Sequence, residues 1–186
     1  MPLGVQGGYS EPPSLRNNLI NALPPAAPLP LAVRIPSSDP LYRLKRDRLA
    51  EQSLSTQQTF QLTRAADPLP PELLPHMRLV QAESAEEAAA VAFGAGAGPV
   101  SAANEARVLG QLAGHLRWRL GRYRTSIEQD EAVIADETAG SRQRVAAKLL
   151  RIEKGILAAG LAQLMRMPGA AEAAAAPQPL SAVILE

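Results

Sequence analysis

The helical spacing of apolar residues between positions 101 and 165 constrains the fold of this chain more than any other feature. Leucines and isoleucines recur there every three or four residues, so they share one face of an α-helix. The first series is Leu109, Leu112, Leu116, Leu120, Tyr123 and Ile127. The second series follows a break at residues 138–141 and is Val145, Leu149, Leu150, Ile152, Ile156, Leu157, Leu161 and Leu164. We expect two long helices joined by a short link, and such helices pack antiparallel.

The composition favours an all-α fold. Alanine accounts for 34 of the 186 residues, whereas aromatic residues make up only 3% of the chain. A core of Leu, Val, Ile and Ala suits close-packed helices better than a sheet sandwich rich in β-branched and aromatic side chains. The chain has no cysteine, which excludes disulfides, thiolate zinc sites and thiol catalysis. Its 19 Lys and Arg nearly balance its 18 Asp and Glu, so the net charge of +1 identifies no partner.

Prolines and alanines divide the chain into three parts. Eight of the 17 prolines lie in the first 36 residues, where each removes a backbone donor and disfavours a helix. We therefore predict a Pro-rich extended or disordered segment over residues 1–36 and a helical domain over residues 37–168, with a short extended piece at residues 55–64. Residues 169–186 are predicted to be a disordered, Ala-rich, low-complexity tail.

Local signals mark the helix ends. Ser38 or Asp39 can cap a first helix, and Ser101 is the predicted N-cap of the first long helix. Three glycines lie inside that long helix, Gly110, Gly114 and Gly121, and each costs about 1 kcal/mol relative to alanine. We therefore expect a close helix neighbour at these glycines.

No set of residues forms a catalytic, cofactor-binding or metal-ligating site. His76 and His115 are the two histidines of the chain, and neither stands in a triad context, so we expect packing or surface roles for both. The glycines at 94–98 follow an alanine-rich helix rather than the strand that a dinucleotide loop requires. The acidic run at residues 128–137 is expected to form a solvated helix face.

One cluster has the character of a binding surface. Arginines interleaved with aromatic side chains grip phosphates and stack on bases, and the same groups can hold acidic side chains of a protein. Three interpretations stay open: ion pairs with the acidic run, contact with a protein partner, and binding of nucleic acid, which is the least favoured. The candidate partner-binding residues are Arg117, Trp118, Arg119, Arg122, Tyr123 and Arg124.

Five motifs occur in an order that resembles one family. They are DPLYRLKRDRLAEQ from residue 39, DPLPPELLPHMRLV from residue 67, PVSAANEARV from residue 99, GRYRTSIEQDEAVI from residue 121 and RQRVAAKLLRIEKGIL from residue 142. Their order, spacing and character are similar to those of the C-terminal substrate-binding domain of the Rubisco large-subunit lysine methyltransferase family. The catalytic half of that family is a SET domain.

The resemblance implies an all-helical domain that presents a protein substrate to the methyltransferase. It implies two partners, a SET catalytic half and a lysine-bearing protein such as the Rubisco large subunit. The chain contains no Asn-His pair of the kind with which SET domains bind S-adenosylmethionine. We therefore expect neither a SET core nor methyltransferase activity in this chain alone, and S-adenosylmethionine is implied only for a SET half upstream.

Two alternative functions stay open. A stand-alone helical adaptor or dimerisation domain is the first, and an RNA-binding helix pair is the weaker second. No apolar run approaches the roughly 20 residues that a membrane span needs, and the opening residues MPLGVQGGYS lack the pattern of a secretory signal. We expect a soluble intracellular protein, in the chloroplast or the cytoplasm, with no membrane partner.

Overall fold

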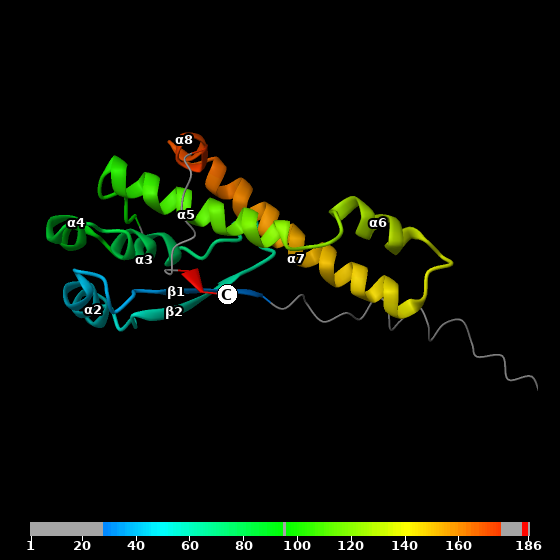
Figure 1. Cartoon of the computed structure of the whole chain (residues 1–186), viewed down its shortest axis with the longest axis horizontal. Coiled ribbons are helices and arrows are strands. Elements are labelled where there is room, and N and C mark those ends of the chain that lie inside the picture. The colour runs from blue at the N-terminus through cyan, green and yellow to red at the C-terminus, as the bar shows by residue number, and fades with distance from the viewer. Residues whose placement is uncertain (1–27, 95, 176–183, 186) are drawn as a thin grey trace, which may run out of the picture.

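A computed structural model describes residues 28–94, 96–175 and 184–185 of the chain. The elements in chain order are β1 (Leu29–Arg34), α2 (Tyr42–Glu51), β2 (Gln57–Leu62), α3 (Leu73–Val80), α4 (Ala85–Ala90), α5 (Ala102–Gly121), α6 (Ile127–Ala135), α7 (Ser141–Met165), α8 (Ala170–Ala175) and β3 (Ile184–Leu185). Helices α3, α5 and α7 lie on one side of a small sheet (Figure 1). The predicted, mostly helical fold is confirmed, and the sheet adds to it.

The sheet has the antiparallel strand order β2-β1-β3. Side chains alternate along a strand, so Leu29, Leu31 and Val33 of β1 point into the core and are buried. The end of the predicted Pro-rich segment over residues 1–36 is therefore extended but not disordered, because residues 29–35 belong to the packed body. Interspersed prolines hide this period of two in the sequence. Residues 1–27 lie outside the described part of the chain.

The predicted tail also contributes to the fold. Helix α8 packs against α5 and buries Ala170 and Ala173, while residues 184–185 pair with β1. Alanine has a small side chain, which lets two helices approach closely, so an Ala-rich stretch that has the composition of a low-complexity tail is part of the core. Residues 176–183 and 186 lie outside the described part.

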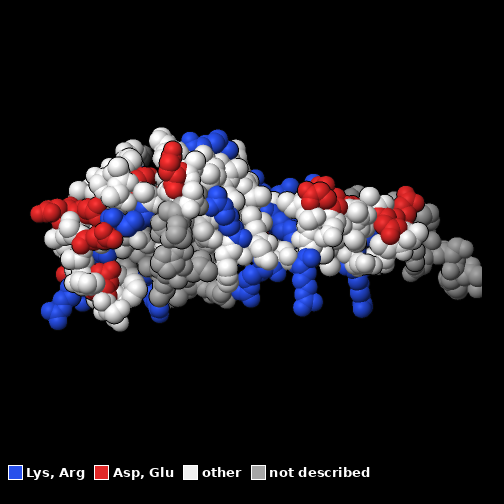
Figure 2. Space-filling model, turned by 45° about the horizontal axis from the view of Figure 1, so that its top comes forward, with Lys and Arg blue, Asp and Glu red and all other residues white. Residues whose placement is uncertain are grey.

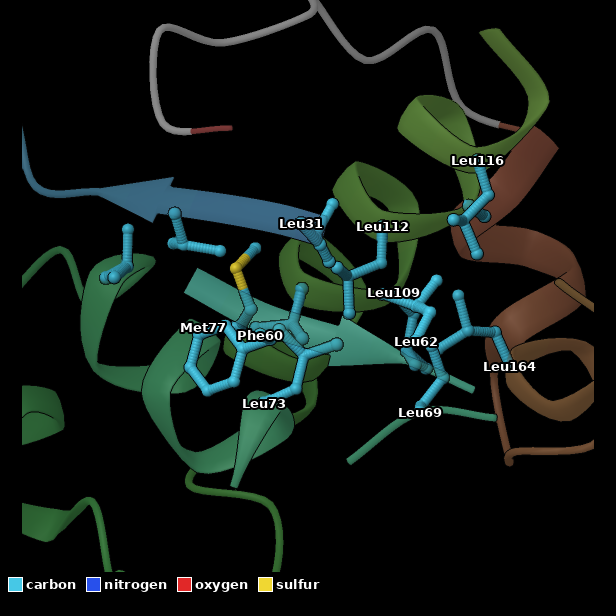
Figure 3. Close-up of a cluster of buried hydrophobic side chains, with 14 of the residues drawn as sticks. Leu31, Phe60, Leu62, Leu69, Leu73, Met77, Leu109, Leu112, Leu116 and Leu164 are labelled. Carbon is cyan, nitrogen blue, oxygen red and sulfur yellow. The ribbon is translucent and has the colours of Figure 1, made fainter. Parts of the chain in front are cut away.

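Leucines from several elements meet in the main core (Figure 3). Its labelled members are Leu31, Phe60, Leu62, Leu69, Leu73, Met77, Leu109, Leu112, Leu116 and Leu164. Helix α7 approaches this core at Gly160, where an added Cβ would lie 3.4 Å from Leu69 Cδ2. A Cβ added at Gly114 or Gly121 would meet nothing within 4 Å, so the predicted close neighbour at those two glycines is wrong.

The long antiparallel helix pair consists of α5 and α7 (Figure 1). The Ser101 hydroxyl accepts a hydrogen bond from the Asn104 N–H at 3.0 Å, which confirms the predicted N-cap of α5. That helix ends at Gly121 and does not run on to Ile127, because a capping box at Ser126 begins the separate helix α6. Helix α6 packs on the first half of α7, and residues 127–153 project from the body as an arm (Figure 1).

Candidate functional site

A groove of about 430 Å³ opens between the sheet and the C-terminal end of α5. Pro30 and Ala32 alternate with the core residues of β1, so they face away from the core and form the sheet wall together with Thr59. The helix wall carries basic and aromatic side chains, and we call the site the basic–aromatic groove. This wall consists of His115, Trp118, Arg119, Arg122 and Tyr123.

Two arginines of the groove are oriented by their neighbours. Arg119 Nη1 donates to the Pro30 carbonyl oxygen at 2.8 Å and so ties α5 to β1. The guanidinium carbon of Arg122 lies 5.0 Å from the centroid of the Trp118 ring, within the range of a cation–π interaction. The Trp118 ring in turn lies 5.6 Å from the His115 ring. Guanidinium groups held beside an aromatic face suit a carboxylate or a peptide carbonyl as a ligand.

The structure brings four of the six predicted binding residues together. These four are Trp118, Arg119, Arg122 and Tyr123. Arg117 points elsewhere, with its Nη2 atom 3.8 Å from Met165 Sδ on α7, because consecutive residues of a helix lie about 100° apart. Arg124 is exposed beyond the end of α5 and does not line the groove.

Tyr123 links the groove to the arm. Its hydroxyl donates to Glu153 Oε2 at 3.1 Å, and Lys154 Nζ lies 5.3 Å from the centroid of its ring. Burial raises the pKa of Tyr123, and the negative charge of Glu153 and its hydrogen bond raise it further. The phenol therefore stays protonated and keeps its donor role at neutral pH.

A buried ion pair lies at the base of the arm, and the sequence analysis missed it. Lys154 Nζ lies 2.5 Å from Asp130 Oδ2, and both side chains are only 3% exposed. The ammonium group also donates to the carbonyl oxygens of Thr125 and Ser126 and to Thr125 Oγ1. The predicted solvated face of the acidic run is thus wrong for Asp130, because α6 folds back on α7 and turns this acid inward.

The surroundings of Asp130 keep it ionised. Burial by itself raises the pKa of this carboxyl group, but hydrogen bonds from Lys154 and Thr125 and the charge of Lys154 outweigh burial and lower it. The acidic run forms its ion pairs with α7, where Glu131 also meets Arg151 at 2.8 Å. The interpretation that this run pairs with the arginine cluster of α5 finds no support in these two contacts.

Both histidines lie in the interior. His76 is fully buried and stacks edge-to-face on Phe60, with ring centroids 5.2 Å apart, as its predicted packing role requires. Burial lowers the pKa of His76 to about 4, so the ring is neutral at pH 7. His115 is also buried, beside Trp118.

Polar pairs that the sequence analysis did not predict join α3 to the first turn of α5. Arg78 donates to both carboxylate oxygens of Glu105, at 2.7 and 2.9 Å, and Asn104 Nδ2 donates to the Arg78 carbonyl oxygen. Over the described residues, there is no cluster of three or more metal-binding side chains and no helix long and apolar enough to cross a membrane.

Comparison with known proteins identifies the family of this domain. The sequence profile described as Rubisco LSMT substrate-binding matches residues 36–157. The chain belongs to the Rubisco LSMT substrate-binding family. The resemblance carried by the five motifs is thereby confirmed. A search among curated proteins gave no match.

Solved structures share the fold of this Rubisco LSMT substrate-binding domain. The structure of Rubisco LSMT bound to AdoMet superposes with a TM-score of 0.65 and 22% identity, over 78% of this chain and 35% of that one. The SET domain of LSMT bound to MeLysine and AdoHcy also superposes with a TM-score of 0.65 and 22% identity, over 78% and 34% of the two chains. The chain therefore spans about a third of the length of these proteins.

Residues of two family motifs converge at the base of the arm. The motif from residue 121 supplies Tyr123, Thr125 and Asp130, and the motif from residue 142 supplies Lys154. In this Rubisco LSMT substrate-binding domain, these side chains hold the end of α5, the start of α6 and the middle of α7 together. The network thus supports the helix wall of the basic–aromatic groove through Tyr123.

Proposed function

We propose that this chain is the protein-substrate-binding module of a SET-type protein-lysine methyltransferase, and that the basic–aromatic groove contacts the substrate. The observation that carries the proposal is that the family match over residues 36–157 includes the whole helix wall of the groove. The substrate is a lysine-bearing protein, and the Rubisco large subunit is the first candidate because the solved relatives are Rubisco LSMT structures.

The chemistry of the groove favours a protein ligand over the methyl donor. S-adenosylmethionine carries a sulfonium and an ammonium cation besides its single carboxylate, and Arg119 and Arg122 can pair only with that carboxylate. Among the described residues that line the groove there is no carboxylate that could balance the two cations. The groove does not fit this cofactor, and we assign the cofactor and methyl transfer to a SET half.

Binding measurements can test this function. We expect the purified chain to bind Rubisco holoenzyme, the separately expressed SET half of Rubisco LSMT, or both, in isothermal titration calorimetry. The variant R119E/R122E should bind Rubisco at least about tenfold more weakly, since each reversal places a carboxylate against an acidic or carbonyl-bearing ligand. The control R43E/R142E reverses two exposed arginines outside the groove and changes the net charge equally.

The possible results separate the candidate functions. An absence of binding to both Rubisco and the SET half would overturn the proposal. A stable dimer in sedimentation, without substrate binding, would support the adaptor alternative instead. Retention on RNA that disappears when Arg117, Arg119 and Arg122 are changed together to Glu would support the RNA-binding alternative.

A further inference from the structure

A second groove runs along the arm, away from the basic–aromatic groove. It is bounded by α6 and α7 and by the segment that follows β2, and its two neighbouring hollows measure about 270 and 370 Å³. The hollows share Arg64, Glu131, Arg151 and Ile152, so they form one continuous depression. We call it the arm groove. None of its lining residues lines the basic–aromatic groove.

The arm groove carries an excess of positive charge. Its charged lining residues are Arg64, Lys148, Arg151 and a single acid, Glu131. Glu131 is neutralised by Arg151 at 2.8 Å, whereas neither Arg64 nor Lys148 forms an ion pair within the described residues. In Figure 2, basic side chains project from the lower side of the arm and acidic ones lie along its upper side.

The floor of the arm groove is apolar. Ile127, Ile134 and Ile152 line it and are only partly buried, so each leaves hydrocarbon surface in contact with water. Gly155 of α7 also lines the groove and leaves room there, because a Cβ added at this position would meet nothing within 4 Å. The arm is thus a two-helix hairpin with one apolar face open, and a third helix packed there would complete a three-helix arrangement.

We infer that the arm groove binds an acidic amphipathic helix of the protein substrate, an inference that rests on the proposed function. The apolar side of such a helix covers the isoleucines, and its acidic flanks meet Arg64 and Lys148. Charge complementarity argues for this occupant over the N-terminal segment of the chain itself, since residues 1–27 contain one acid, Glu11, and one base, Arg16.

A synthetic peptide tests the inference independently of any substrate. The probe is a fluorescein-labelled 14-residue peptide with leucines at helical spacing and glutamates at the flanking positions, and its binding is measured by fluorescence anisotropy. We expect R64E/K148E to weaken binding at least about tenfold, since it replaces attraction by repulsion. G155W should weaken it similarly by filling the groove, while G155A should retain it.

Matched controls make the result decisive. R43E/R142E carries the same charge change outside the arm groove and should bind the peptide like the unmodified chain, as should R119E/R122E. Equal binding of a peptide with every glutamate replaced by lysine, or unchanged binding by R64E/K148E and G155W, would overturn the inference. Absence of peptide binding while Rubisco or the SET half still binds would overturn it too, and would leave the proposed function intact.

Discussion

Replacement of Lys154 by methionine removes the ammonium group at the base of the arm while keeping most of the side-chain volume. In the folded protein, Lys154 and Asp130 are each 3% exposed, and the ammonium group donates hydrogen bonds to the carboxylate and to residues 125–126. Loss of one partner of a buried ion pair costs about 3–5 kcal/mol, because the other charge stays buried without compensation. We expect a loss of this size in the free energy of unfolding of K154M.

The loss should appear first in the arm. The ion pair joins α6 to α7, and α6 packs chiefly on α7, so α6 has little other support. Hydrogen exchange followed by mass spectrometry should therefore show α6 amides exchanging at least about a hundredfold faster in K154M, since 1.4 kcal/mol corresponds to a factor of ten. Urea denaturation monitored by circular dichroism measures the change in the free energy of unfolding of the whole domain.

Two further variants separate the buried charge from other effects. K154M/D130L removes both charges and should recover most of the lost stability. R151M breaks the ion pair between Arg151 and Glu131, whose side chains are 48% and 50% exposed. It should lower the free energy of unfolding by no more than about 1 kcal/mol. The reasoning would be refuted if K154M stayed within 1 kcal/mol of the unmodified chain, or if the double variant were as unstable as the single one.

The pH dependence of K154M follows from the pKa of Asp130. In the unmodified chain this pKa lies below its ordinary value of about 3.9, so the pair contributes its full stability above that pH, and the contribution is lost as the pH falls through the folded-state pKa. In K154M the ammonium group is absent, so we expect burial to raise the pKa of Asp130. The difference in the free energy of unfolding between K154M and the unmodified chain should therefore be largest at pH 7 and shrink towards pH 4.5.

Three more predictions concern the body of the domain. Burial lowers the pKa of His76 to about 4 in the folded protein, against about 6.5 in the unfolded chain. Between pH 7 and pH 5 the unfolded chain therefore binds a proton at His76 and the folded protein does not, so the free energy of unfolding should fall by roughly 2 kcal/mol. H76L should abolish that loss in urea titrations at the two pH values. G114A should stabilise the domain by about 1 kcal/mol in thermal unfolding, because alanine favours the helix and its Cβ meets nothing within 4 Å. S101A should cost about 1 kcal/mol through loss of the cap on the Asn104 N–H.

Much of the helical architecture could be predicted because its determinants are local. The spacing of Leu109, Leu112 and Leu116 indicates a buried helix face, and Ser101 marks where that helix begins. The break at residues 138–141 also agrees with the start of α7 at Ser141. Each of these signals depends on residues within one or two helical turns, so it can be read from the sequence alone.

The strand at residues 29–34 could not be separated from a linker in the same way. Leu29, Leu31 and Val33 alternate, but the prolines around them indicate an extended chain of any kind. What makes this segment a strand is its pairing with β2, in which Leu31 lies opposite Phe60. That pairing joins residues about thirty positions apart, so it cannot be predicted from the composition of the segment itself.

The candidate site shows the same division. Its arginines and aromatic residues could be found as a sequence cluster, and helical spacing brings Trp118 and Arg122 together for their cation–π contact. The sequence alone thus determined the two long helices, the cap of α5 at Ser101 and the residue types of the binding surface. Only the tertiary structure placed Pro30 opposite Arg119 and buried Asp130 against Lys154. These contacts join residues 89 and 24 positions apart, and whether such residues meet depends on how whole elements pack.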